Sequence, residues 1–160
     1  MNADPASLID FLKGPFFAAC ATSAFSVLFG LHSADVLLAS GGAAIGWTVF
    51  QIIPQTGSPA FAAFLAALAA GLYSELAGWF RARPATVYMI ASIIPLVPGG
   101  GMYYTMLSIL EGESSRSVDL IMATLMTAFA IAAGLAIANA LGRMVFATSS
   151  HSIPRRNTKP

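Results

Sequence analysis

Apolar residues run along most of this chain in long blocks, separated by short segments that contain charge, proline or glycine. Four of the blocks fall at about residues 14–31, 36–53, 60–80 and 118–146. A transmembrane helix needs about 20 predominantly apolar residues, and each of these blocks is close to that length or longer. We therefore predict one membrane-spanning helix in each block, with residues 32–35 as the first loop.

The block from Pro84 to Leu110 is equally apolar, but it contains a conformational break. Two prolines and three consecutive glycines stand between Ile93 and Met106. Proline removes a backbone donor and disfavours helix in the preceding residue, and glycine raises the entropic cost of helix. Non-helical backbone is tolerated at membrane depth only where it is buried in protein or lines a water-filled cavity. We predict a fourth span that is broken here, beside a substrate path.

Composition strengthens the membrane assignment. Of 160 residues, 57% are hydrophobic and only 9% are charged, whereas soluble domains carry about 25% charged residues. We predict an all-α integral membrane protein with about five spans, in a single transmembrane domain over residues 1–147. Residues 148–160 contain Arg155, Arg156 and Lys159, and we predict that they form a disordered basic tail.

The basic residues are distributed unevenly over the two sides that five spans define. One side collects Arg81, Arg83, Arg143, Arg155, Arg156 and Lys159, and the other holds Lys13 and Arg116. Cytoplasmic loops carry an excess of lysine and arginine. The count predicts a multi-pass protein of the cell (inner) membrane with its N-terminus outside and its C-terminus in the cytoplasm.

Several functional classes lack their signatures. The net charge of +1 gives no indication of nucleic-acid binding, and the single Cys20 excludes an intrachain disulfide and a cysteine-based metal site. HExxH, GxSxG and GxxxxGK[ST] motifs are absent, so neither an enzyme nor a nucleotide loop is indicated. We expect no cofactor and no metal. Because residues 1–10 contain two acids and no base, and the apolar run continues well past Cys20, we interpret that run as a span and not as a signal peptide.

Small residues recur at four-residue spacing, which lets helix backbones approach closely. The pairs are Gly42 with Gly46 and Ala67 with Gly71, and the last span carries Gly134, Ala138 and Gly142. We predict that they pack helices together, with Ser117 as the N-cap of the last span.

The break is the first candidate site. A half-helix beginning near Gly101 would direct its N-terminal N–H groups and positive dipole end into the membrane, where they could bind a carboxylate. Nearby hydroxyl groups could add contacts. The candidate substrate-binding residues are Pro95, Pro98, Gly99, Gly100, Gly101, Tyr103, Tyr104 and Thr105. The alternative is a re-entrant turn that only packs.

Glu75 is the second candidate, because it lies within an otherwise apolar span. An ionised carboxylate there is costly, so burial favours the neutral form and the group could take up and release a proton. Alternatively, Glu75 is an interfacial residue paired with Arg81 or Arg83. Gln51 and Asn139 are secondary polar candidates, which could instead lie near headgroups or pair helices.

Several of these motifs resemble one family. Pro84-Ala85-Thr86, residues 94–106, Gly46-Trp47 and Ser74-Glu75 are similar to the threonine/serine exporter family, over about residues 16–146. The chain resembles the short subunit that corresponds to the C-terminal half of the fused exporters, and the family also includes a split succinate exporter. The resemblance implies export of small hydrophilic metabolites, most of all threonine or serine, with a longer companion subunit.

Two alternatives remain open: a dicarboxylate exporter subunit of the succinate type, and a membrane scaffold that transports nothing. For an exporter we expect coupling to protons, as in an antiporter. Five spans with several small-residue faces leave more packing surface than so short a bundle can bury. Besides lipid and the small solute, we therefore expect a protein partner, either the longer subunit or another copy of this chain.

Overall fold

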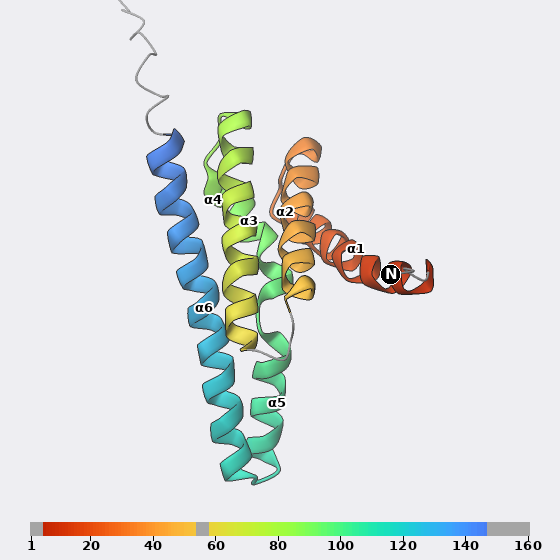
Figure 1. The fold of residues 1–160 in the computed structure, drawn as a ribbon, viewed down its shortest axis with the longest axis vertical. Helices are drawn as coiled ribbons and strands as arrows, with labels where there is room; N and C mark the ends of the chain where they lie inside the picture. The colour runs from red at the N-terminus through yellow and green to blue at the C-terminus, as the bar shows by residue number, and fades with distance from the viewer. Residues whose placement is uncertain (1–4, 54–57, 147–160) are drawn as a thin grey trace, which may run out of the picture.

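Every regular element that the structure describes is helical. The structure is a computed structural model, and it describes residues 5–53 and 58–146. In chain order the elements are α1 (Pro5–Leu28), α2 (Ser33–Ile52), α3 (Pro59–Arg81), α4 (Ala85–Ser92), the short 3₁₀ helix η1 (Ile94–Leu96), α5 (Gly99–Leu110) and α6 (Ser114–Phe146) (Figure 1). The predicted all-α class is confirmed.

The helices also have the lengths that membrane crossing requires. Four described segments are long and apolar enough to span a bilayer: Ile9–Leu28, Ser33–Ile52, Pro59–Arg81 and Ser114–Val145. A fifth crossing results if Ala85–Leu96 and Gly99–Leu110, which are bent by 48° at their junction, form one broken span. The predicted domain end at residue 147 and the predicted basic tail lie outside the described residues.

Helix α3 occupies the middle of the bundle, between α2 and α6 (Figure 1), and also packs against α4. Its neighbours approach closely through small residues. A Cβ on Gly134 of α6 would lie 2.6 Å from the backbone oxygen of Phe64, and a Cβ on Gly46 of α2 would lie 3.2 Å from the Cβ of Ala70. Gly71 lies equally close against Ala138. These contacts confirm that the predicted small-residue faces pack helices.

Two other parts extend away from this centre. Helix α1 packs mainly against α2, but its axis is steeply inclined to the other helices (Figure 1). Helix α5 packs mainly against the N-terminal part of α6, and together they project past the ends of α2 and α3 (Figure 1). Gly101 makes this contact close, since a Cβ there would lie 2.5 Å from Oγ1 of Thr124.

Helices α1, α2 and α5 begin earlier than predicted. Helix α5 begins at Gly99 and not near Gly101, because the Pro98 carbonyl already accepts a hydrogen bond from the Met102 N–H (3.1 Å). The first span begins well before residue 14, at Pro5. Helix α2 begins at Ser33, so most of the segment predicted as the first loop is helical.

Ser117 is not the N-cap of the last span. The left-handed backbone of Gly112 (φ 76°) ends the preceding turn, and α6 already begins at Ser114. The Ser117 hydroxyl therefore lies inside the helix and donates to the carbonyl of Glu113 (2.9 Å).

Candidate functional site

The break in the fourth span is a short and well-defined segment. Helix α4 ends at Ser92, one 3₁₀ turn follows as η1, and Val97 and Pro98 are non-helical. The Leu96 N–H donates to the carbonyl of Ile93 (2.8 Å), and the Gly99 N–H donates to that of Val97 (2.7 Å). The break thus satisfies part of its own backbone through local turns, as a non-helical segment within a membrane requires.

Two cavities border this break. One, of about 330 Å³, lies between α1 and α2 and is bounded by Trp47 and Pro95. A second, of about 180 Å³, is bounded by Trp47, Phe50, the segment 95–98 and Thr127 of α6. Trp47 and Pro95 therefore line both hollows, and the break lies against both. A larger hollow of about 390 Å³ between α2 and α3 is lined by apolar residues alone, which suits lipid better than a polar solute.

The predicted substrate-binding residues fall into two groups. Pro95 and Pro98 border the cavities, while Gly99 and Gly100 are exposed, with no atom within 4 Å of where a Cβ would stand. Tyr103 is 64% exposed and Tyr104 55% exposed, and their rings contact each other edge to face at 5.3 Å.

Thr105 differs from its tyrosine neighbours. Its Oγ1 is buried and has no hydrogen-bond partner among the described residues. The structure thus places the prolines and the first two glycines at the break, buries the Thr105 hydroxyl on α5, and leaves the tyrosine rings on the outer surface of that helix.

Glu75 lies at the interface between α3 and α6, against a glycine. A Cβ on Gly142 would stand 2.6 Å from the Oε2 atom of Glu75, so only glycine leaves room for the carboxyl group there. Arg143, the next residue of α6, interacts electrostatically with Glu75 and donates to the Oδ1 atom of Asn139 (3.1 Å). Two sequence candidates, Glu75 and Asn139, therefore approach the same arginine.

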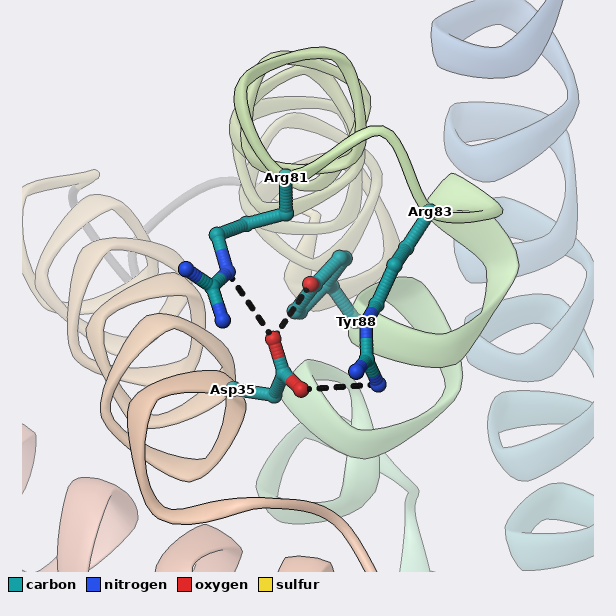
Figure 2. Close-up of polar contacts among 4 residues, drawn as sticks. All are labelled: Asp35, Arg81, Arg83 and Tyr88. Carbon is teal, nitrogen blue, oxygen red and sulfur yellow. Dashed lines mark hydrogen bonds and ion pairs between the residues drawn. The ribbon is translucent and has the colours of Figure 1, made fainter.

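The predicted alternative, in which Glu75 pairs with Arg81 or Arg83, is wrong, because both arginines contact another acid. Figure 2 shows the carboxylate of Asp35, at the N-terminal end of α2, between Arg81 and Arg83. Asp35 Oδ1 accepts hydrogen bonds from Tyr88 Oη (2.7 Å) and Arg81 Nε (3.3 Å), and Asp35 Oδ2 lies 3.0 Å from Arg83 Nη1. We call these four residues the Asp35 cluster.

The Asp35 cluster joins three helices at one end of the bundle. Asp35 and Tyr88 are both fully buried, whereas the side chains of Arg81 and Arg83 are 41% and 44% exposed. Its members come from the start of α2, the end of α3 and the first turns of α4 with the loop before it. A buried carboxylate is tolerated because two cations and a hydroxyl compensate for its lost hydration.

Sequence reasoning missed this cluster because it placed Asp35 in a loop. A signal was present, since a lone acid before the second span and two bases after the third fall on the same membrane side in a five-span chain. Nothing local to either segment indicated that they would meet.

Further hydroxyl groups link neighbouring helices. Ser23 of α1 lies 2.7 Å from Ser40 of α2, and Ser74 of α3 lies 3.2 Å from Ser92 of α4, oxygen to oxygen. Such pairs are common between membrane helices, where they replace contacts with water.

Long apolar helices that pack through glycine and alanine, with one span broken beside cavities, define a multi-pass membrane protein. Comparison with known families then narrows the class. The family model described as Threonine/Serine exporter, ThrE, matches residues 15–141, and the chain belongs to this family. The family is one of transporters and not of enzymes. Among curated proteins and solved structures, no match to the chain was found.

Proposed function

We propose that this chain is a membrane subunit of a secondary exporter for small hydrophilic metabolites, with threonine and serine as its solutes. The observation that carries the proposal is the break at η1, which lies against two cavities. The chain also belongs to a family of exporters. In many secondary transporters, substrate sites lie near the bilayer midplane beside discontinuous helices. The broken α4–α5 span has this construction.

The N-terminal turn of α5 is the proposed site for the carboxylate of the solute. The first N–H groups of a helix have no intrahelical partner, and the helix dipole favours an anion there. Gly99 and Gly100 carry no side chain, and nothing else stands within 4 Å of their Cβ positions. An anion could therefore approach the backbone closely. The buried and unpaired Oγ1 of Thr105 is a second polar group on the same helix.

Transport by reconstituted protein tests this proposal. The chain is co-purified with whatever subunit accompanies it, placed in lipid vesicles, and assayed for movement of labelled threonine, serine and succinate. We expect threonine and serine to move faster than through empty vesicles. Movement of succinate alone would favour the dicarboxylate alternative. No movement of any of the three would favour a scaffold that transports nothing.

Glu75 is the proposed proton-coupling group. Its carboxyl group lies in the α3–α6 interface near Arg143, so a change of its charge would alter that contact. Glu75→Gln keeps the size and hydrogen bonding but cannot titrate, so we expect normal assembly with a loss of proton-driven export of at least about tenfold. Exchange of solute for solute should persist. The measurement is threonine export under an imposed pH gradient.

A matched control for Glu75 is available outside the bundle. Glu113 is exposed and pairs with Arg116 one turn away (2.9 Å), so Glu113→Gln should leave the export rate unchanged. If Glu75→Gln exports with the rate and pH dependence of the unaltered protein, Glu75 is not the coupling group.

We further propose that the exporter requires a second polypeptide, either a longer companion subunit or another copy of the chain. Helices α5 and α6 support this, because only 11% of the apolar window of α6 is buried and Ser108 is the one fully buried residue of α5 among those described. Mass measurement in mild detergent should give an assembly larger than one chain. A strictly monomeric preparation that still transports would contradict this proposal.

A further inference from the structure

Two buried polar atoms on α2, where this helix faces Gly14 of α1, have no partner among the described residues. The Nε1 atom of Trp47 and the Oε1 atom of Gln51 are buried and form no hydrogen bond within the described ranges. The two residues are four apart on α2, so their side chains lie on the same face of that helix. Buried polar groups are nearly always paired, and an unpaired donor beside an unpaired acceptor requires an explanation.

Helix α1 makes room for this pair through a glycine. A Cβ on Gly14 would overlap Trp47 Nε1 and would stand 2.7 Å from Gln51 Nε2, so any larger residue would displace both side chains. Gly14 and Trp47 also line the cavity of about 330 Å³, together with Pro95 of the break. Trp47 therefore borders a space of the size that small-molecule sites start from, about 300 Å³, and Gln51 contacts the same glycine as Trp47.

The chemistry of the pair restricts what can fill it. An indole N–H only donates and an amide oxygen only accepts. A hydroxyl group does both, so a single hydroxyl can accept from Trp47 Nε1 and donate to Gln51 Oε1. A methyl group of the same size satisfies neither atom. A carboxylate would satisfy the indole, but it would be repelled by the amide oxygen.

We infer that Trp47 and Gln51 bind the side-chain hydroxyl of a hydroxylated amino acid and so select it against its apolar isostere. The inference rests on the proposed function, because it names the part of the exported solute that this cavity recognises. Pro95 links the two ends of the site, since it borders both this cavity and the one that continues toward Pro98. The carboxylate would lie at the N-terminus of α5 and the hydroxyl between α1 and α2.

Tryptophan fluorescence tests the inference without any transport assay. The chain has two tryptophans, so Trp79→Phe leaves Trp47 as the only indole. The protein, with its co-purified partner, is placed in lipid nanodiscs and titrated with L-threonine and with L-valine, which replaces the hydroxyl with a methyl group. We expect threonine to change the emission at concentrations at least about tenfold lower than valine, because sites that hydrogen-bond a hydroxyl reject analogues that lack it.

The second arm removes the acceptor. Gln51→Met keeps the length of the side chain without the amide, and should bring the threonine and valine midpoints to within about twofold of each other. Thr48→Val is the matched control: its hydroxyl donates to the Ala44 carbonyl of its own helix (2.7 Å), so the preference for threonine should persist. Equal midpoints in the protein with native Gln51, or no saturable change, would overturn the inference and leave an ordered water as the occupant.

Flux in vesicles separates this inference from the proposed function. Trp47→Phe removes the N–H donor and keeps a ring, and it should lower the ratio of threonine to valine transport by about tenfold or more. If Trp47→Phe and Gln51→Met export threonine over valine as selectively as the unaltered chain, only the inference fails. If threonine binds selectively but is not transported, only the export proposal fails.

Discussion

Buried polar groups near the two ends of α2 differ in whether side chains of other helices contact them. Near its N-terminus, the carboxylate of Asp35 contacts two arginines and a tyrosine from α3, α4 and the loop between them. Near its C-terminus, Trp47 and Gln51 present a donor and an acceptor that contact no such group in the described part of the chain. The two places are about 18 Å apart along the helix, at 1.5 Å per residue from Asp35 to Trp47.

This difference separates a structural site from a candidate binding site. The Asp35 cluster pairs its buried charge with two arginines, although Asp35 Oδ2 lies within ion-pair distance of Arg83 without forming a hydrogen bond to it. Its removal should therefore lower stability. The donor of Trp47 and the acceptor of Gln51 have no partner among the residues that the structure describes and are available to a ligand. Their removal should therefore change ligand binding and leave the free energy of unfolding nearly unchanged. Stability measurements on variants at both ends of α2 therefore test this difference.

The largest effect on stability should follow from removing both cations of the Asp35 cluster. Arg81→Ala combined with Arg83→Ala leaves a fully buried carboxylate with only Tyr88 as a partner. Breaking a buried ion pair typically costs about 3–5 kcal/mol, because a buried charge is left uncompensated. Unfolding in mixed micelles with increasing denaturing detergent measures this free energy.

A third substitution is the control for that experiment. Adding Asp35→Asn removes the buried, uncompensated charge, so we expect the triple variant to recover most of the lost stability. If the double variant is as stable as the unaltered chain, the Asp35 cluster does not hold the three helices together.

A smaller effect is expected at Tyr88. Its hydroxyl donates to the Asp35 carboxylate over 2.7 Å, and Tyr88→Phe should lower the free energy of unfolding by about 1.5–3 kcal/mol, the range for hydrogen bonds to charged groups. Tyr103→Phe provides the control, because Tyr103 is 64% exposed and should show no change. An equal loss in both variants would indicate a general sensitivity to losing a hydroxyl and not a role for the cluster.

The smallest effect is expected at the unpaired groups. Gln51→Met and Thr105→Val each remove a buried polar atom that has no partner among the described residues, so stability should change by less than about 0.5 kcal/mol or increase slightly. The same unfolding measurement applies. A loss as large as that of Tyr88→Phe would show that these groups are paired, and the contrast between the two ends of α2 would disappear.

Much of the fold was predictable because its causes are local. Apolar blocks of sufficient length predicted the spans, and prolines with three glycines predicted the break. The spacing of Gly134, Ala138 and Gly142 predicted the packed face of α6, which the close approach to α3 confirms. Errors at helix starts were equally local: at Gly99 and at Ser114, turn geometry decided the first residue.

The sites were harder to predict, because they depend on which helices become neighbours. The contact of Asp35 with Arg81 joins residues 46 apart in the chain, and no periodicity within either segment records it. The direction of Tyr103 was also undecided by sequence, since α5 could have turned that ring toward the break. Gln51 was a candidate only because it is polar within a span, and its position beside Trp47 and Gly14 needed coordinates.

The length of α6 brings the surrounding bilayer into the geometry of the site. Its 33 residues measure about 50 Å along the axis, whereas the hydrocarbon core of a membrane is about 30 Å thick. Even at a tilt of about 40°, the upper end of the usual range, only about 26 residues fit in that core. The remaining turns must reach the headgroup layer. Helix α5 packs against the N-terminal part of α6, so a thinner or thicker membrane would change the tilt of both helices. That change would shift Gly99 relative to Trp47. Lipid thickness would then affect the geometry of the break that a solute meets.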